Sequence, residues 1–345
     1  MTAVVTGANG FLGSVLVRML LAQGRRVRAV VRSSSRGLEG LNVEIVKADV
    51  RDLDDLRHAF TGAESVFHLA AVISLTGDQG GRVTETNVGG ARNAAIAALE
   101  TGVRRYIHCS SIHAFDLTNT TLLIDETTPG VGNDHPIYDR TKAMGETVVR
   151  QVLKDGLPGI IINPSGVIGP GDHQPSRIGQ VLLDLQERKF PALIPGGFNW
   201  VDVRDVCMGA INAEQHGHVG ENYILSGWWH STRQLASFGQ EVTGIAPPRI
   251  DVPMWLARGL AGFWKGWPWA SHSKLGDVGS QIWRPNADAI SALRGARDVS
   301  HAKAARDLGY NPRPIRESVH DAYRWFEQAH MLKSPHRPLR EQSHD

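Results

Sequence analysis

The sequence predicts an α/β fold in which a doubly wound parallel sheet is followed by a smaller C-terminal lobe. Through the first 165 residues, short runs of apolar and β-branched residues alternate with longer helical patterns. Strands joined by helical crossovers are parallel and are buried on both faces. After residue 165 the chain becomes rich in Gly and Pro, and all nine Trp residues lie between Trp200 and Trp325. This change in composition marks the second lobe.

The alternation predicts the elements in order along the chain. We expect strands at 3–6, 27–31, 43–46, 65–69, 105–109 and 159–162, and helices at 11–22, 53–60, 83–99 and 136–154. Two later segments, 199–213 and 222–225, have strand-helix and strand patterns and are expected to return to the first lobe. The predicted first domain is therefore 1–165, completed by 199–226. The second lobe comprises 166–198 and 227–332, and 333–345 is a flexible tail.

Length and charge restrict the class of protein. At roughly 150 residues per domain, 345 residues suggest about two domains. The 37 Lys and Arg residues nearly balance the 35 Asp and Glu residues, which gives a net charge of +2 and no long basic run. A nucleic-acid binder needs a basic patch or stripe, so we expect no nucleic-acid partner.

Cysteine usage and hydropathy bear on location. Cys109 and Cys207 are far apart and match neither a disulfide framework nor the spacing of metal ligands. The first residues enter an apolar strand directly, without the charged segment that begins a cleavable leader. No apolar run approaches the roughly 18 residues of a spanning helix. We therefore expect a cytoplasmic protein without a membrane partner.

The turn after the first strand predicts a dinucleotide site. The run GANGFLG lies between a strand and a helix and contains Gly7, Asn9, Gly10, Phe11, Leu12 and Gly13. Glycines let the backbone approach a pyrophosphate, and a helix N-terminus offers free N–H groups and a partial positive charge. The GxxGxxG spacing is one residue longer than the GxGxxG fingerprint of dinucleotide dehydrogenases. A plain strand-to-helix turn is the alternative interpretation.

The end of the second strand bears on the choice of cofactor. An NAD site normally has an acidic residue there for the ribose 2′-hydroxyl, whereas this chain has Arg32, Ser33 and Arg36. A guanidinium pairs well with two phosphate oxygens, so NADP(H) is predicted in preference to NAD(H). The alternative is a solvated loop that binds no ligand.

Three side chains suggest acid/base chemistry. Tyr138 and Lys142 are one turn apart on the helix expected at 136–154, and Ser111 follows a strand. An ammonium beside a phenol favours the phenolate and lowers the phenol's pKa, which suits proton transfer near neutral pH. A hydroxyl at a strand end can donate to a carbonyl oxygen on which charge develops during hydride addition. Taken alone, a Tyr and a Lys at this spacing are typical of a helix surface.

As a set, the motifs resemble the extended short-chain dehydrogenase/reductase family. TGANGFLG, KADV, FHLAA, NVGG, the CSS strand end, YDRTK and NPSGVIGPGD occur in that family's order over roughly residues 1–205. The C-terminal LGYNPRPIRESVHDAYRWF resembles the end of such enzymes. The best match is to members similar to dihydroflavonol reductases and to NAD-dependent epimerases. The resemblance implies a Rossmann sheet, an NAD(P) cofactor and a substrate-binding C-terminal lobe.

The resemblance also implies residue roles. Tyr138 is the proton donor and acceptor, Lys142 lowers its pKa and binds the nicotinamide ribose, and Ser111 polarises the substrate oxygen, with Ser110 as its rival. Asn87 helps to order the proton relay, and the alternative is that it only organises buried hydrogen bonds. Asp49 flanks the adenine, and the alternative is that it is an acidic residue at a helix start. The predicted cofactor-binding residues are Gly7, Asn9, Gly10, Phe11, Leu12, Gly13, Arg32, Ser33, Arg36, Asp49, Val50, Leu69, Ala70, Ala71, Tyr138, Lys142, Pro164 and Val167. A homodimer through the helices at 83–99 and 136–154 is implied as well.

The Trp-rich stretch 255–283 suggests the substrate class. It holds five Trp residues in a region expected to cover the substrate, and aromatic walls favour an apolar or ring-bearing small molecule. Packing of the small lobe's core and an interfacial membrane patch are the alternative interpretations. His113 and His135 lie near the site in sequence, where a histidine could aid proton relay; ordinary loop histidines are the simpler interpretation. No spacing of His, Cys or acidic residues predicts a metal site.

The leading hypothesis is a carbonyl reductase, or in reverse an alcohol dehydrogenase. It moves a hydride between NADP(H) and the carbonyl or alcohol carbon of an apolar or aromatic small molecule, with Tyr138 as general acid/base. A sugar-nucleotide epimerase that uses the same three residues is the alternative, and a non-catalytic NADP(H)-sensing protein is a second. The run Ser111-Ile112-His113 lacks the Asp-Glu pair of sugar-nucleotide dehydratases, which counts against dehydration.

Overall fold

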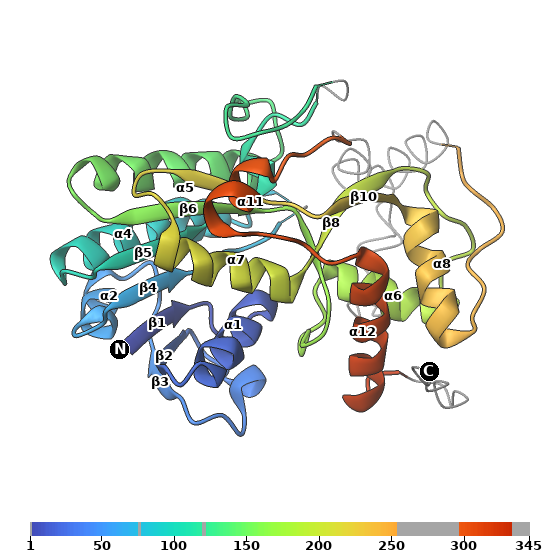
Figure 1. Ribbon diagram of the computed structural model, residues 1–345, viewed down its shortest axis with the longest axis horizontal. Coiled ribbons are helices and arrows are strands. Elements are labelled where there is room, and N and C mark those ends of the chain that lie inside the picture. The colour runs from blue at the N-terminus through green and yellow to red at the C-terminus, as the bar shows by residue number, and fades with distance from the viewer. Residues whose placement is uncertain (1, 75–76, 119–121, 254–296, 333–345) are drawn as a thin grey trace.

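A parallel sheet forms the centre of the molecule (Figure 1). The computed structural model describes residues 2–74, 77–118, 122–253 and 297–332. Within them, seven strands pair in the order β3-β2-β1-β4-β5-β6-β9, and every neighbouring pair is parallel. The strands are β1 (Thr2–Thr6), β2 (Arg26–Val31), β3 (Glu44–Lys47), β4 (Ser65–His68), β5 (Arg105–Cys109), β6 (Gly159–Pro164) and β9 (Asn222–Leu225). Their carboxyl ends therefore share one edge, and the predicted α/β fold is confirmed.

Helices cover both faces of this sheet. One face packs on α1 (Phe11–Ala22), α7 (Val203–His216) and α11 (Ala302–Leu308), and the other on α2 (Leu53–Phe60), α4 (Gly90–Glu100) and α5 (Ile137–Lys154). Side chains of one strand alternate between the two cores: Phe67 belongs to the α1 side and Val66 to the α4 side. Burial on both faces explains why these strands are short, nearly continuous apolar runs.

The smaller lobe is built around a second sheet in the order β10-β8-β7. Its elements are β7 (Gly166–Ile168), α6 (Arg177–Gln186), β8 (Gly197–Asp202), β10 (Trp228–Ser231), α8 (Thr232–Thr243) and α12 (Ile315–Gln328). A separate apolar cluster that includes Leu182, Trp200 and Phe326 holds them together. Figure 1 shows α6, α8 and α12 gathered at one end of the molecule, away from α2.

Two segments differ from the predicted elements. The segment 199–226 is divided, because β8 pairs with β7 and β10 in the small sheet while α7 packs on the large sheet and β9 extends it. The helix expected at 83–99 is interrupted: α3 (Arg82–Thr84) passes through a π-helical turn, η2 (Glu85–Gly89), into α4. Such turns re-aim a side chain inside a helix and are frequent at functional sites. The Trp-rich stretch and the C-terminal tail lie outside the described residues.

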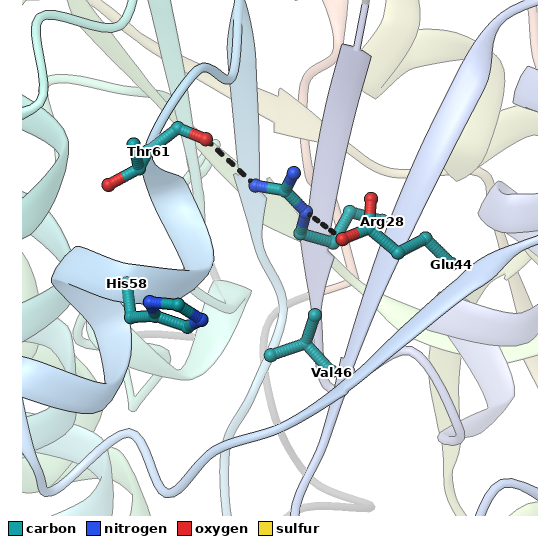
Figure 2. A pocket seen from close by; sticks show the side chains of 5 residues that line it. All are labelled: Arg28, Glu44, Val46, His58 and Thr61. Carbon is teal, nitrogen blue, oxygen red and sulfur yellow. Dashed lines mark hydrogen bonds and ion pairs between the residues drawn. The ribbon is translucent and has the colours of Figure 1, made fainter.

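A hollow of about 330 Å³ lies against the outer strands, lined by Arg28, Glu44, Val46, His58 and Thr61 (Figure 2). Its Arg28 and Glu44 side chains are already paired with each other. The Arg28 guanidinium donates to the Glu44 carboxylate at 2.8 Å and to the Thr61 carbonyl at 2.9 Å. Because α2 returns the chain from the carboxyl edge to the amino edge of the sheet, a hollow beside its last turn lies away from the glycine turn. We therefore interpret it as part of the packing between α2 and the sheet.

Arg28→Ala is expected to lower the free energy of unfolding by about 1–3 kcal/mol, because the Glu44 carboxylate and the Thr61 carbonyl lose a partly buried charged donor. The measurement is urea denaturation. Arg26→Ala is the matched control on the same strand, since Arg26 is exposed and has no ion pair with any described residue. Equal losses of unfolding free energy in Arg28→Ala and Arg26→Ala would contradict the interpretation that the hollow is part of the packing between α2 and the sheet.

Candidate active site

The turn between β1 and α1 brings backbone very close to the loop after β4. Gly7 has a φ of +67°, and a Cβ there would lie 2.9 Å from the backbone of Ala70. A Cβ on Gly13 would overlap the Gly7 carbonyl oxygen, so the first turn of α1 packs directly on the strand end. Glycine is therefore required at both positions by sterics.

The N-terminus of α1 fits an anionic ligand. Gly10 caps this helix without a side-chain hydrogen bond, and its first turn contains no acidic residue. The free N–H groups and the positive end of the helix dipole are thus not neutralised by the protein. Phe11 and Leu12 pack against the core, while the Asn9 carbonyl oxygen Oδ1 accepts from the Gly37 amide at 2.8 Å. A pyrophosphate is the group that such a turn accommodates.

The loop after β2 presents Arg32, Ser33 and Arg36 to solvent. Arg18 fixes the base of this loop by donating to the Gly37 carbonyl at 2.9 Å. The exposed guanidiniums of Arg32 and Arg36 form no ion pair with a described residue. They are therefore available to a phosphate without first breaking an internal contact.

Asp49 and Val50 follow β3 at the same edge. The Arg51 guanidinium hydrogen-bonds the Asp49 carboxylate at 2.8 Å and lowers the pKa of that carboxyl, with Arg32 contributing in the same direction. Val50 is buried, and its side chain fills the space against Gly90 on α4. Asp49 and Val50 thus lie beside the loop that carries Arg32.

The remaining predicted cofactor residues lie at strand ends. The amides of Leu69 and Ala70 donate to the Thr6 hydroxyl at 3.2 and 3.3 Å, which fixes the chain after β4, and Ala71 is exposed beyond them. Pro164 closes β6, and Val167 lies in β7. All of these positions follow the carboxyl edge, where ligands bind in open α/β sheets.

A short path of contacts connects the glycine turn to Tyr138. Beyond Ala70, the backbone N–H of Val72 donates to Asn87 Oδ1 at 2.8 Å, and Asn87 Nδ2 donates to the Val72 carbonyl oxygen at 3.0 Å. Asn87 Nδ2 also donates to the Thr141 hydroxyl at 3.1 Å, and that hydroxyl donates to the Tyr138 carbonyl at 3.0 Å. Asn87 therefore ties the loop after β4 to α5. Thr141 carried no signal in the sequence.

Tyr138 lies on the first turn of α5 and faces Ser111 at the end of β5. Burial raises the pKa of the Tyr138 phenol, while a side-chain hydrogen bond with Ser111 and the charge of Arg177 act in the opposite direction. The one-turn spacing of Tyr138 and Lys142 predicted that Lys142 lowers the pKa of the Tyr138 phenol. That direction is wrong for this structure, because desolvation of the phenol is the largest influence.

Lys142 lies one turn further along α5 and is 5% exposed. Its Nζ donates to the Cys109 carbonyl oxygen at 3.0 Å, and burial lowers the pKa of the ammonium. Ser110, the rival to Ser111, is buried with a hydroxyl that has no partner among the described residues. Of the two serines, Ser111 is the one that meets the phenol.

His113 also belongs to this cluster, whereas His135 does not. The His113 ring lies edge-on to Tyr138 with centroids 5.7 Å apart, and its Nδ1 is 3.1 Å from the Asp139 carboxylate. His135 instead faces Asp134, at 3.8 Å. Arg177, at the start of α6, is a further charge near Tyr138 that sequence analysis missed, because nothing in the sequence relates the two helix starts.

The described residues were also compared with what a metal site and a membrane-spanning helix require. In that part of the chain, no group of three or more His, Cys, Asp or Glu side chains is arranged to hold a metal ion. Its helices include none with the length and apolar composition needed to span a membrane.

Known proteins resemble this chain over nearly its whole length. The model of the NAD dependent epimerase/dehydratase family matches residues 3–226. The chain is 33% identical to sterol demethylase protein B of Methylococcus capsulatus, with 96% of this chain and 100% of that protein covered. It is 31% identical to a putative dihydroflavonol 4-reductase of a Synechocystis species, over 96% of each chain. The crystal structure of gox2253 matches with a TM-score of 0.82 and 34% identity, over 96% of this chain and 99% of that one.

Proposed function

The chain belongs to the NAD-dependent epimerase/dehydratase family, which confirms the resemblance of its motifs to extended short-chain dehydrogenases/reductases, and we propose that it is an NADP(H)-dependent carbonyl reductase. The observation that carries the proposal is that the segment after β5, which carries Ser111, packs on the first turns of α5, which carry Tyr138 and Lys142, at the sheet edge that also holds the open glycine turn. The substrate is an apolar or ring-bearing small molecule, and the reverse reaction is oxidation of the corresponding alcohol.

The protein's own groups supply the proton chemistry. A bound nicotinamide cofactor delivers the hydride in reduction and accepts it in oxidation. A phenol is protonated at neutral pH, so Tyr138 can donate to the substrate oxygen, and the hydrogen bond with Ser111 and the charge of Arg177 oppose the rise in its pKa that burial causes. Ser111 donates to the same oxygen as negative charge develops there. The positive charges of Lys142 and Arg177 then stabilise the phenolate that Tyr138 becomes.

Two features support the substrate class. The full-length relatives are named for a sterol and for a dihydroflavonol, both of which are fused-ring molecules of low polarity. Beside Tyr138, the rings of His113 and Phe198 stack on each other with centroids 5.7 Å apart, so aromatic side chains lie next to the phenol. An aromatic environment suits a ring-bearing substrate better than a diphosphate sugar.

A cofactor-consumption assay tests the proposal. The purified protein is mixed with NADPH and a panel of aromatic and alicyclic aldehydes and ketones, with sugar nucleotides as the second arm. We expect stoichiometric loss of NADPH with a carbonyl substrate. Interconversion of sugar nucleotides without net loss of NADPH would instead identify an epimerase, and binding of NADPH without turnover in either arm would identify a sensor.

Arg32→Ala is expected to raise the Kd of NADPH roughly 10- to 100-fold, because a charge-assisted pair with the 2′-phosphate is lost. The Kd of NADH should change by less than about twofold, since that cofactor has no phosphate there. Fluorescence titration measures both constants. Arg26→Ala, at the other end of β2, is the control and should alter neither. Tighter binding of NADH than of NADPH by the unaltered protein would overturn the cofactor preference.

The proposal includes the homodimer that the family resemblance implies. The two helices concerned, α4 and α5, lie side by side on one face of the sheet (Figure 1), and Met144 on α5 is 47% exposed. Sedimentation equilibrium is expected to give twice the chain mass. A monomer at all concentrations would remove this part of the proposal without affecting the reaction.

A further inference from the structure

We propose that Arg18 is a positioning residue for cofactor specificity, because it holds Gly37 and with it the exposed loop 32–36 that would bind a 2′-phosphate. This inference rests on the proposed preference for NADP(H). Arg18 lies on α1, and Gly37 lies in the 3₁₀ turn η1 (Arg36–Leu38), at the end of that loop between β2 and β3. The contact between them joins the helix of the glycine turn to the segment that carries the two exposed guanidiniums.

Both backbone hydrogen-bonding groups of Gly37 are bound by side chains. Arg18 Nη2 donates to the Gly37 carbonyl oxygen at 2.9 Å, and Arg18 Nη1 donates to the Ser14 carbonyl oxygen at 2.9 Å. The Gly37 N–H donates to Asn9 Oδ1 at 2.8 Å. A Cβ at Gly37 would lie 3.1 Å from that same Oδ1, so the backbone packs closely on the Asn9 side chain. Gly37 is therefore attached both to α1 and to the glycine turn before it.

The two hydrogen bonds fix the orientation of both peptide groups that flank the Gly37 Cα. The N–H belongs to the peptide that joins Arg36 to Gly37, and the carbonyl belongs to the peptide that leads to Leu38. Leu38 is 2% exposed and packs in the core beside α1, while Val31 is buried at the end of β2. Arg32 and Arg36 therefore lie in a short exposed segment whose two ends are fixed.

The fixed ends bear on affinity, because a loop that is held before its ligand arrives loses less conformational freedom on binding. The gain applies to a 2′-phosphate, since the guanidiniums of the loop can pair with phosphate oxygens. NADH has a hydroxyl at that position and gains little. The Arg18 guanidinium is already used on two backbone carbonyls, so its contribution to specificity comes through Gly37 and the loop. Direct contact with the phosphate is the rival role, and the test separates the two.

The test compares the Kd of NADPH and the Kd of NADH for Arg18→Met by fluorescence titration. Met keeps a long unbranched side chain of similar helix propensity and removes only the guanidinium. We expect the Kd of NADPH to rise roughly 5- to 20-fold and the Kd of NADH to stay within about twofold. In an Arg32→Ala background, Arg18→Met should raise the Kd of NADPH by less than about threefold, because the loop then has one guanidinium fewer to hold in place.

Hydrogen exchange in the cofactor-free protein gives a readout that does not depend on binding. The amides of residues 32–38 should exchange faster in Arg18→Met than in the unaltered protein, because the bond to the Gly37 carbonyl is lost and the segment opens more often. A guanidinium that only contacts a bound phosphate would leave this exchange unchanged. The melting temperature shows that the variant is folded.

Arg28→Met is the matched control. Arg28 also donates to two backbone carbonyls, those of Ala59 and Thr61, but these lie at the end of α2 and just beyond it. The control therefore loses the same kind of contact away from Gly37. It should alter neither Kd nor the exchange of residues 32–38.

Three results would overturn the inference. The first is an equal change in the Kd of NADPH and the Kd of NADH for Arg18→Met, including no change in either. The second is an unchanged exchange of residues 32–38, and the third is full additivity of Arg18→Met and Arg32→Ala, which would make Arg18 an independent phosphate ligand. Tighter binding of NADH than of NADPH by the unaltered protein would instead count against the proposed cofactor preference itself.

Discussion

Tyr138→Phe is expected to lower kcat by about 10²- to 10⁴-fold while leaving the Kd of NADPH within about twofold of its starting value. Only the hydroxyl is lost, so the ring keeps its edge-on contact with His113 and α5 keeps its first turn. The substrate oxygen then has no proton donor at the moment of hydride addition. Steady-state kinetics with a carbonyl substrate and fluorescence titration with NADPH measure the two quantities.

Tyr106→Phe is the control for this experiment. Tyr106 is fully buried on β5, and its hydroxyl has no partner among the described residues. Removing an unpaired buried hydroxyl leaves the fold stable or slightly stabilises it. Activity should therefore persist in Tyr106→Phe and vanish in Tyr138→Phe. Retained activity in Tyr138→Phe would remove the proposed acid/base role.

Gly7→Ala is expected to weaken NADPH binding by more than about tenfold and to lower the free energy of unfolding by about 1–3 kcal/mol. The stability loss arises because Gly7 has a φ of +67°, a conformation that alanine rarely adopts. The loss of affinity arises because the new methyl group would lie 2.9 Å from the Ala70 backbone and push apart the two loops of the predicted cofactor site. Calorimetry measures the affinity, and urea denaturation measures the stability.

Gly24→Ala separates these two effects. Gly24 follows α1, has a φ of +74°, and has nothing within 4 Å of where its Cβ would be. The same backbone strain is therefore introduced without the contact at Ala70. We expect a comparable loss of stability and an unchanged Kd. Unweakened NADPH binding by Gly7→Ala would contradict the location of the cofactor turn.

The sequence allowed the sheet and the glycine turn to be predicted, because each has a local signature. Buried parallel strands are continuous apolar runs, and Gly7 and Gly13 occupy positions where a Cβ does not fit. The π-helical turn at Asn87 was not predictable, since it depends on hydrogen bonds to Val72 and Thr141, which come from distant segments. A helical pattern alone gives no indication of such an interruption.

The electrostatics of the site were the least predictable feature. Sequence spacing brought Lys142 next to Tyr138 on one helix face, which suggested a lowered phenol pKa. The structure reverses that direction because burial depends on the whole surrounding fold. The pairing of His113 with Asp139 was missed for a similar reason: the 3₁₀ turn η3 (Ile112–Ala114) and α5 are 23 residues apart in sequence and meet only when β5 and α5 pack together.

The central claim is that hydride moves directly between a nicotinamide and a substrate carbonyl beside Tyr138. The most direct measurement uses NADPH deuterated at the transferable C4 position, with the alcohol product analysed by mass spectrometry and NMR. We predict one deuterium at the former carbonyl carbon for each NADPH consumed, and for Tyr138→Phe the same labelling of a product that forms about 10²- to 10⁴-fold more slowly. A product without deuterium at that carbon, formed at the normal rate, would contradict the account.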